Sequence, residues 1–127
     1  MLKHLTPDGV RPPFAAYSHA VEVAAGARLV FCSGQLGISV DDAIPEDTQA
    51  QAELCFSAIG TILAAAGMTL RNVVRINAYV TGREHMKPYM AVRDRLFPAP
   101  SPASTLMIVG GFTREEFKVE VEVVAAG

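Results

Sequence analysis

The chain has 127 residues, a formal net charge of −2 and 50% hydrophobic side chains. This length fits one domain, residues 1–127, which can bury on the order of two thirds of the surface that its unfolded chain exposes. The acidic balance gives no electrostatic reason to expect nucleic acid as a partner. The apolar runs are too short for a membrane span, and no signal-peptide segment follows the first residues, so we expect a cytoplasmic protein without a membrane partner. In that compartment Cys32 and Cys55 are expected to be free, buried thiols.

The first third of the chain predicts strands. Residues 1–16 are rich in proline and glycine and predict an extended lead-in, in which a short edge strand can form at residues 3–5. Residues 17–24 and 28–33 predict two strands that pair as a hairpin around Gly26. The second is almost entirely apolar, which is typical of a central strand. It ends at Ser33 and Gly34, where the glycine permits close approach of backbone or ligand, or forms a plain bulge.

Two helices are predicted from capping residues and apolar spacing. The first follows the loop 36–47, begins at Asp47 or Thr48 and ends at Gly67, with apolar side chains recurring every three or four residues. The second covers residues 84–97 and is locally basic through several arginines, which we interpret as a solvated helix face.

Three further strands are predicted at residues 70–80, 103–109 and 118–125. The last alternates strictly, so Val119, Val121 and Val123 face one side and Glu120 and Glu122 the other. The order β-β-α-β-α-β-β predicts an α+β fold, with one mixed sheet and two helices on one of its faces. The other face needs water or another copy of the chain as cover, because it carries polar side chains: Arg75, Asn77, Tyr79, Glu120 and Glu122.

Four stretches of the chain resemble segments of the RidA (YjgF) family. Residues 15–21 resemble its Gly-Pro-Tyr-Ser-x-Ala segment, with Ala15-Ala16 in place of Gly-Pro. Residues 31–35 resemble its Ser-Gly-Gln turn, residues 64–67 its Ala-Ala-Gly helix end, and residues 118–122 its closing strand. The resemblance covers essentially the whole chain. It implies a chorismate-mutase-like fold, a homotrimer with clefts between subunits, and hydrolysis of reactive 2-imino or enamino acids to 2-keto acids and ammonia.

The resemblance also implies site residues. It places Tyr17, Ser33, Gly34 and Glu120 in the cleft, where the glutamate holds or activates the attacking water. A carboxylate within one hydrogen bond of a water is a plausible general base.

The chain departs from the family at residues 102–105, Pro-Ala-Ser-Thr, where imine-deaminating members have Pro-Ala-Arg-Ser/Thr. Ser104 stands in place of the arginine that binds the substrate carboxylate, and Leu106 in place of a frequent cysteine. A serine hydroxyl cannot supply the missing charge, which is worth about 1.5–3 kcal/mol in binding. Arg11, Arg93 or another cation is left as a candidate replacement.

Three functions remain open. The first is an enzyme acting on an imine, an enamine or a related compound other than a standard 2-imino acid. The second is a non-catalytic trimer that binds a small metabolite in the same cleft. The third, a ribonuclease or translation inhibitor, is disfavoured by the acidic balance. We favour the enzyme, with Glu120 and Tyr17 catalytic and with four substrate-binding residues: Ser33, Gly34, Ser104 and Leu106.

No cofactor or metal is predicted. His4, His19 and His85 are scattered along the chain, and the two cysteines have no metal-binding spacing. There is also no glycine-rich phosphate loop that would indicate a nucleotide.

Overall fold

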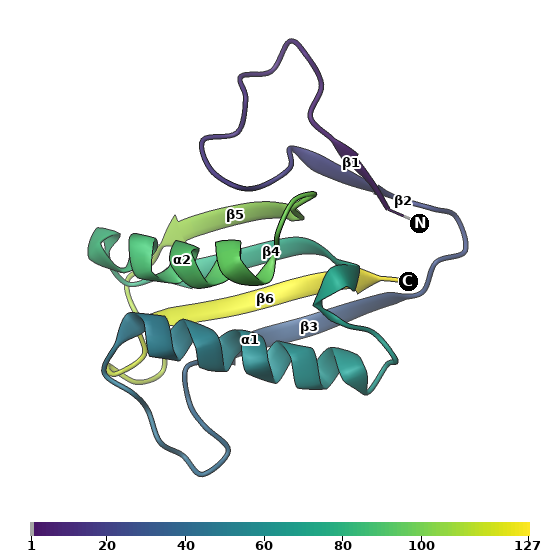
Figure 1. Cartoon of the computed structure of the whole chain (residues 1–127). Coiled ribbons are helices and arrows are strands. Elements are labelled where there is room, and N and C mark those ends of the chain that lie inside the picture. The colour runs from purple at the N-terminus through teal and green to yellow at the C-terminus, as the bar shows by residue number, and fades with distance from the viewer. Residues whose placement is uncertain (1) are drawn as a thin grey trace.

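The computed structural model describes residues 2–127. Their elements follow the predicted order, with the short first strand present (Figure 1). The bounds are β1 Leu2–Leu5, β2 Ala20–Val23, β3 Leu29–Leu36, α1 Thr48–Ala64, β4 Val73–Val80, α2 Met86–Leu96, β5 Ala103–Ile108 and β6 Val119–Ala126. Single 3₁₀ turns, Leu70–Asn72 and Arg83–His85, precede β4 and α2.

The strands of residues 2–127 form a four-stranded sheet in the order β3-β6-β4-β5 and a separate pair, β1-β2. β4 and β5 run parallel and the other pairs are antiparallel, which confirms the mixed sheet. Both helices cover one face of the four-stranded sheet, and the α+β fold is confirmed (Figure 1). The pair β1-β2 and its long loop, residues 2–23, stand apart above β5; we call this segment the arm.

A backbone link joins the arm to the main sheet. Ser18 forms a parallel bridge with Ala103 at the start of β5, and its N–H donates to the carbonyl of Pro102 at 3.2 Å. The hydroxyl of Ser18 donates to the carbonyl of Ser101 at 2.5 Å. The arm therefore continues the sheet beyond β5 through a single residue of the described chain.

The predicted hairpin of residues 17–24 and 28–33 is wrong. β2 pairs with β1, and β3 pairs with β6. The turn at Gly26, whose φ is +83°, directs the chain from one sheet to the other instead of folding it back. The prediction of a central strand is also wrong, because β3 lies at an edge of the sheet and its Phe31 side chain is 75% exposed.

The core lies between the two helices and the sheet. The side chain of Asp47 caps α1 by accepting from the N–H of Ala50 at 3.0 Å, and Gly67, with φ +72°, closes the turn after the helix as expected. The alternating strands β4 and β6 bury their apolar residues against α1 and α2. Cys32 and Cys55 are both free and buried, which confirms that prediction.

The side chain of Gln51 on α1 forms hydrogen bonds with two loops. Its buried Nε2 donates to the carbonyls of Pro45 and Glu116, both at 2.8 Å, and its Oε1 accepts from the N–H of Lys118 at 2.9 Å. A Cβ on Gly37 would lie only 2.3 Å from the Cβ of Gln51, so the loop after β3 packs directly on this side chain. These contacts fix the chain immediately before Glu120.

Arg93 departs from the predicted solvated face of the second helix, because its side chain is only 4% exposed. Its guanidinium lies 5.8 Å from the ring centroid of Tyr89, and its Nε donates to Asp94 Oδ1 at 3.0 Å. Burial of the charge is made possible by this adjacent carboxylate.

Candidate functional site

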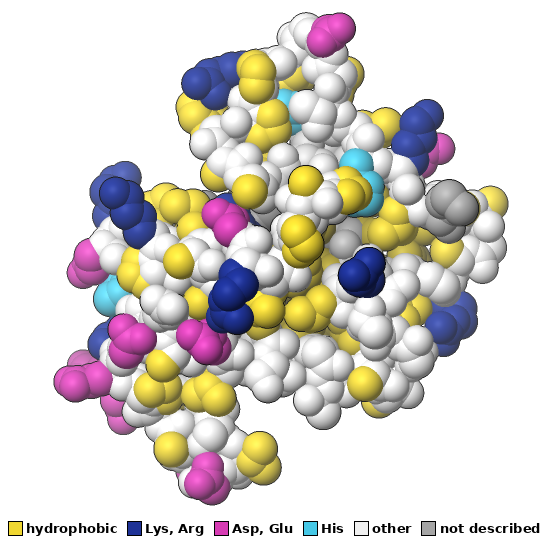
Figure 2. Space-filling model, in the orientation of Figure 1, with side chains coloured by type: hydrophobic (Ala, Val, Ile, Leu, Met, Phe, Trp, Pro, Cys, Tyr) yellow, Lys and Arg dark blue, Asp and Glu magenta, His cyan; other side chains and the backbone are white. Residues whose placement is uncertain are grey.

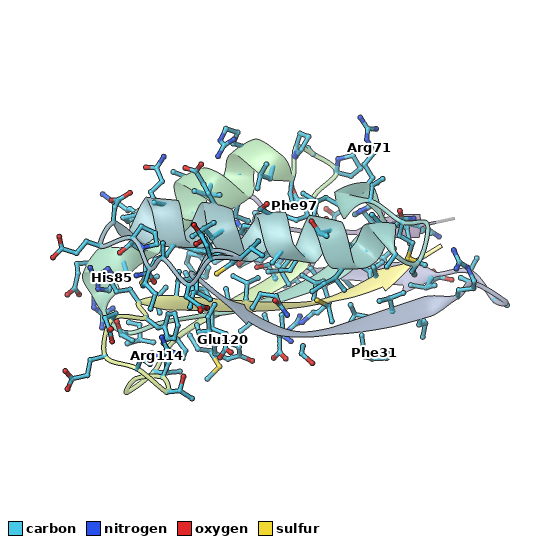
Figure 3. The ribbon with its side chains drawn as sticks, turned by 90° about the horizontal axis from the view of Figure 1, so that it is seen from below. Phe31, Arg71, His85, Phe97, Arg114 and Glu120 are labelled. Carbon is cyan, nitrogen blue, oxygen red and sulfur yellow. The ribbon has the colours of Figure 1, made fainter. Side chains whose placement is uncertain are left out.

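Polar side chains gather on the sheet face that no helix covers, as expected. In Figure 3, Glu120 and Phe31 both lie on the side of the sheet opposite the helices. Register places Glu120 opposite Tyr79, and Glu122 opposite Asn77. We call this surface the open face.

Most polar groups of the open face are paired with one another. The hydroxyl of Tyr79 donates to Glu122 Oε1 at 2.6 Å. Arg75 donates from Nε to Asn77 Oδ1 at 2.9 Å and from Nη2 to Thr105 Oγ1 at 2.6 Å. Within residues 2–127, Glu120 has no such hydrogen bond, and it is the carboxylate of this face that remains available to a ligand or a water.

Gly34 makes room for the Glu120 side chain. A Cβ at position 34 would lie 2.6 Å from Glu120 Oε2 and 2.8 Å from its Cδ. The register of β3 against β6 shifts between Cys32 and Gln35, so Ser33 and Gly34 lie in a bulge beside this carboxylate. Both readings of the glycine thus apply: the strand is irregular here, and the irregularity permits a close approach.

The environment of Glu120 favours its protonated form. Partial burial raises the pKa of this carboxyl group, and repulsion by Glu122 raises it further. The hydrogen bond to Glu122 is the main cause that raises the pKa of Tyr79. A half-buried carboxylate with a raised pKa and no protein partner can hold a water molecule and accept its proton.

The remaining predicted residues lie elsewhere. Tyr17 is in the arm, where its hydroxyl accepts from the N–H of Phe14 at 3.2 Å. Ser104 and Leu106 pair in register with Ile76 and Ala78, so they face the helices. The Oγ of Ser104 is buried without a hydrogen-bond partner among the described residues, and Leu106 packs against the core.

A single chain does not bring Ser104 and Glu120 together. Ser104 faces the helices whereas Glu120 lies on the open face, and Tyr79, which is opposite Glu120, pairs with Met107 on β5. Met107 is three residues along β5 from Ser104, a separation of about 10 Å. The structure therefore unites Ser33, Gly34 and Glu120, and it separates them from Tyr17 and Ser104.

Two hollows adjoin these groups. A shallow one of about 250 Å³ lies on the open face beside Phe31, Ser33 and Glu122. A larger one of about 410 Å³ separates the arm from the end of α2, and Tyr17 lies in its wall together with Asp94. Asp94 was not singled out from the sequence, because a charged residue inside a basic helix is typical of a solvated helix face.

Within the described residues, no cluster of three or more His, Cys, Asp or Glu side chains has the arrangement of a metal site. No helix of residues 2–127 has the length and hydrophobicity that crossing a membrane requires. The cytoplasmic location expected from the sequence stays a prediction.

The fold is that of a RidA-like α+β protein. A family profile described as Endoribonuclease L-PSP matches residues 9–127, and the chain belongs to this RidA/YjgF family. The RutC family protein YjgH of Escherichia coli is 32% identical over 121 residues, which cover 94% of this chain and 90% of that protein.

Two further comparisons bear on fold and activity. A protein of unknown function of the Rid family, YyfB from Yersinia pestis, has a solved structure that matches with a TM-score of 0.87. It is 25% identical, and the match covers 99% of this chain and 98% of that one. A 2-iminobutanoate/2-iminopropanoate deaminase of Dermatophagoides farinae is 25% identical over 112 residues, 87% of this chain and 84% of that protein.

Proposed function

We propose that this protein is a hydrolase of small imines, enamines or related compounds, in which Glu120 activates the attacking water. The observation that carries the proposal is the half-buried Glu120 carboxylate, without a protein partner, lying over the backbone of Gly34. Membership of a family in which some relatives are named imine deaminases supports the reaction class.

The reaction requires one water and one proton carrier. Glu120 accepts a proton as the water oxygen attacks the imine carbon, and the electron pair of the C=N bond moves to nitrogen. Glu120 then returns the proton to that nitrogen, which gives a carbinolamine. As the C–N bond breaks, Glu120 takes the proton of the new hydroxyl group and passes it to nitrogen, so that the carbonyl product and ammonia or an amine leave. In this scheme Tyr17, Ser33 and Gly34 contact and orient the substrate.

The complete site in this proposal lies between copies of the chain in a homotrimer. Tyr17 and Ser104 are separated from Glu120 within one chain, so a second copy has to supply one of the two groups. The open face also exposes apolar side chains, with Phe31 75% and Met107 53% exposed. Covering such a surface is favourable in proportion to the apolar area removed from water.

Nucleic acid is not part of the proposal, although the family description names an endoribonuclease. The net charge is −2, and Lys and Arg side chains are scattered over the helix face rather than gathered into one surface (Figure 2). A backbone-binding site for RNA depends on such a gathered positive surface.

Substitution of Ser104 tests the substrate class. The natural chain should hydrolyse 2-imino acids such as 2-aminoacrylate weakly, because no cation stands at position 104 to meet the carboxylate. Ser104→Arg should raise keto-acid release from enzymatically generated imine by about tenfold to a hundredfold. Ser104→Gln, which adds length without charge, is the control and should not. Robust activity of the natural chain would show that another cation has taken this role.

Substitution of Glu120 separates the enzyme from the non-catalytic binding protein. Glu120→Gln keeps the shape of the side chain and removes its basicity. We expect loss of turnover on a substrate identified by screening imines and enamines, with ligand binding retained. Unchanged turnover would exclude Glu120 as the base, and absence of any turnover in the natural chain would leave the binding function.

A further inference from the structure

The cavity between the arm and α2 has one charged residue in its wall. The cavity lies between the arm and the end of α2. Its volume is about 410 Å³, enough for a small metabolite. Asp94 is the single acidic residue of its wall, and no lysine or arginine lines it; the lining includes His4, Tyr17, Ser18, Phe97 and Ser101.

The Asp94 carboxylate is held by one oxygen and free at the other. The Nε and Nη2 atoms of Arg93 lie 3.0 and 2.9 Å from the same atom, Asp94 Oδ1. Arg93 is 4% exposed and cannot withdraw from this contact without leaving its charge buried and unpaired, whereas the Asp94 side chain is 46% exposed. The contact with Arg93 therefore restrains the carboxylate through Oδ1, and Oδ2 has no hydrogen-bond partner among the described residues.

Tyr17 adds a second feature of the kind that binds cations. Tyr17 is half-buried and belongs to the wall of the same cavity, and an aromatic ring attracts an ammonium group that lies over its face. Its hydroxyl already accepts from the N–H of Phe14, so its own hydrogen is directed elsewhere. Carboxylate and aromatic ring together suit a protonated nitrogen.

The arginine of the adjoining cavity, Arg71, does not compensate the negative charge of Asp94. Arg71 belongs to a second cavity of about 570 Å³, which shares His4 and residues 97–100 with the first. In Figure 3 its side chain projects away from the body of the molecule. Arg93 and Asp94 compensate each other's charge as an ion pair, which leaves Asp94 Oδ2 as a hydrogen-bond acceptor, and Ser104 supplies no charge.

We propose that this cavity binds its ligand through a protonated amine or iminium nitrogen at Asp94, and that it disfavours carboxylates. The inference rests on the proposed function where it names a substrate class, because Tyr17 belongs to both. As a statement about binding it does not depend on turnover. It assigns to the site a small cationic or amine-bearing compound without a carboxylate.

Three matched probes test the proposal on the full chain in its native assembly: benzylamine, benzyl alcohol and benzoate. They share one ring and differ in charge. Titration is followed by NMR of backbone amides. We expect benzylamine to shift amides of the arm and of the end of α2, and to bind at least about tenfold more tightly than benzoate. Equal or tighter binding of benzoate, or no binding of any probe up to its solubility, would overturn the proposal.

Asp94→Asn should abolish the preference for benzylamine. The matched control is Asp42→Asn, the same change in an exposed loop where φ is +67°, a conformation that asparagine tolerates well. Because Asp94→Asn leaves Arg93 buried without its partner, the double variant Arg93→Gln, Asp94→Asn removes both charges and keeps the test valid if the single variant does not fold. Retention of the preference in the folded variant contradicts the role of Asp94.

The outcomes distinguish this inference from the proposed function. Asp94→Asn should abolish the preference for benzylamine whether or not any turnover is found, so this readout does not depend on the chemistry at Glu120. If no turnover is found but benzylamine is still preferred, the proposed enzymatic function is contradicted and the amine-binding cavity is supported. Turnover of carboxylate-bearing imines together with tight benzoate binding would support the proposed enzyme and contradict the amine-binding cavity.

Discussion

Gly34 and Glu120 form the most specific contact of the candidate site. The carboxylate lies where a side chain at position 34 would be, so the two positions are coupled by volume alone. The sequence indicated that a glycine there could serve such an approach, but it could not say which group approaches. The identity of the approaching group depends on the register of β3 against β6, and hence on a residue that is almost ninety positions away in the sequence.

Gly34→Ala should reduce turnover far more than stability. The added methyl displaces the flexible end of Glu120, and a misplacement of about 1 Å can cost a hundredfold in rate. The matched control is Gly60→Ala in α1, where an added Cβ meets nothing within 4 Å and the helix gains about 1 kcal/mol. Steady-state kinetics and thermal melting of both variants provide the measurement. Full activity of Gly34→Ala would contradict the placement of Glu120.

Glu120 also makes stability depend on pH. Because burial and Glu122 raise its pKa in the folded state, folding favours the protonated carboxyl, and the stability that this provides is lost as pH rises through the raised pKa. Glu120→Gln, which is always neutral, should therefore melt at a higher temperature than the natural chain at pH 7. Below about pH 4, where the glutamate is protonated in both states, the difference should vanish. A constant difference across this range would rule out ionisation as its cause.

At the scale of elements, α1 determines where β6 begins, and Gln51 provides the contact. Replacing it by methionine keeps the volume and removes the partner of the Lys118 N–H and of two carbonyls. Gln51→Met should lower the free energy of unfolding by about 2–4 kcal/mol. Gln49→Met, on the exposed side of the same helix, is the control and should change it by less than about 0.5 kcal/mol. Chemical denaturation measures both, and equal effects would show that the Gln51 contacts contribute little.

Sequence patterns predicted elements well where a local period decides them. β4 and β6 alternate as expected and α1 carries the expected apolar stripe, because burial on one face leaves its mark on every second or every third and fourth residue. The prediction of a hairpin was wrong because β2 pairs with β1, and the residues of a short strand do not determine its pairing partner. The burial of Arg93 and the exposure of Asp94 to a cavity were likewise unpredictable, since they depend on the arm packing over the end of α2.

For the whole molecule, we expect the open face to form the contacts of the proposed trimer. Phe31→Asp places a charge on the exposed apolar part of the open face and should convert the expected trimer to a monomer, with the fold retained because Phe31 is 75% exposed in the single chain. Val40→Asp changes a fully exposed loop residue and should leave the trimer intact. Sedimentation equilibrium at micromolar concentration measures both. A monomeric natural chain would remove the proposed site between subunits.

The attachment of the arm through Ser18 has a kinetic consequence. Breaking the Ser18 bridge separates β1 and β2 from β5 without disturbing β4 and β6, so the arm can open as a cooperative unit of its own. Its amide hydrogens should exchange with solvent faster than those of the central strands. A ligand seated between Tyr17 and Asp94 touches both sides of this opening and should slow exchange in β1 and β2 alone. Ligand binding and opening of the arm are then linked, so protection of the arm amides should increase with ligand concentration.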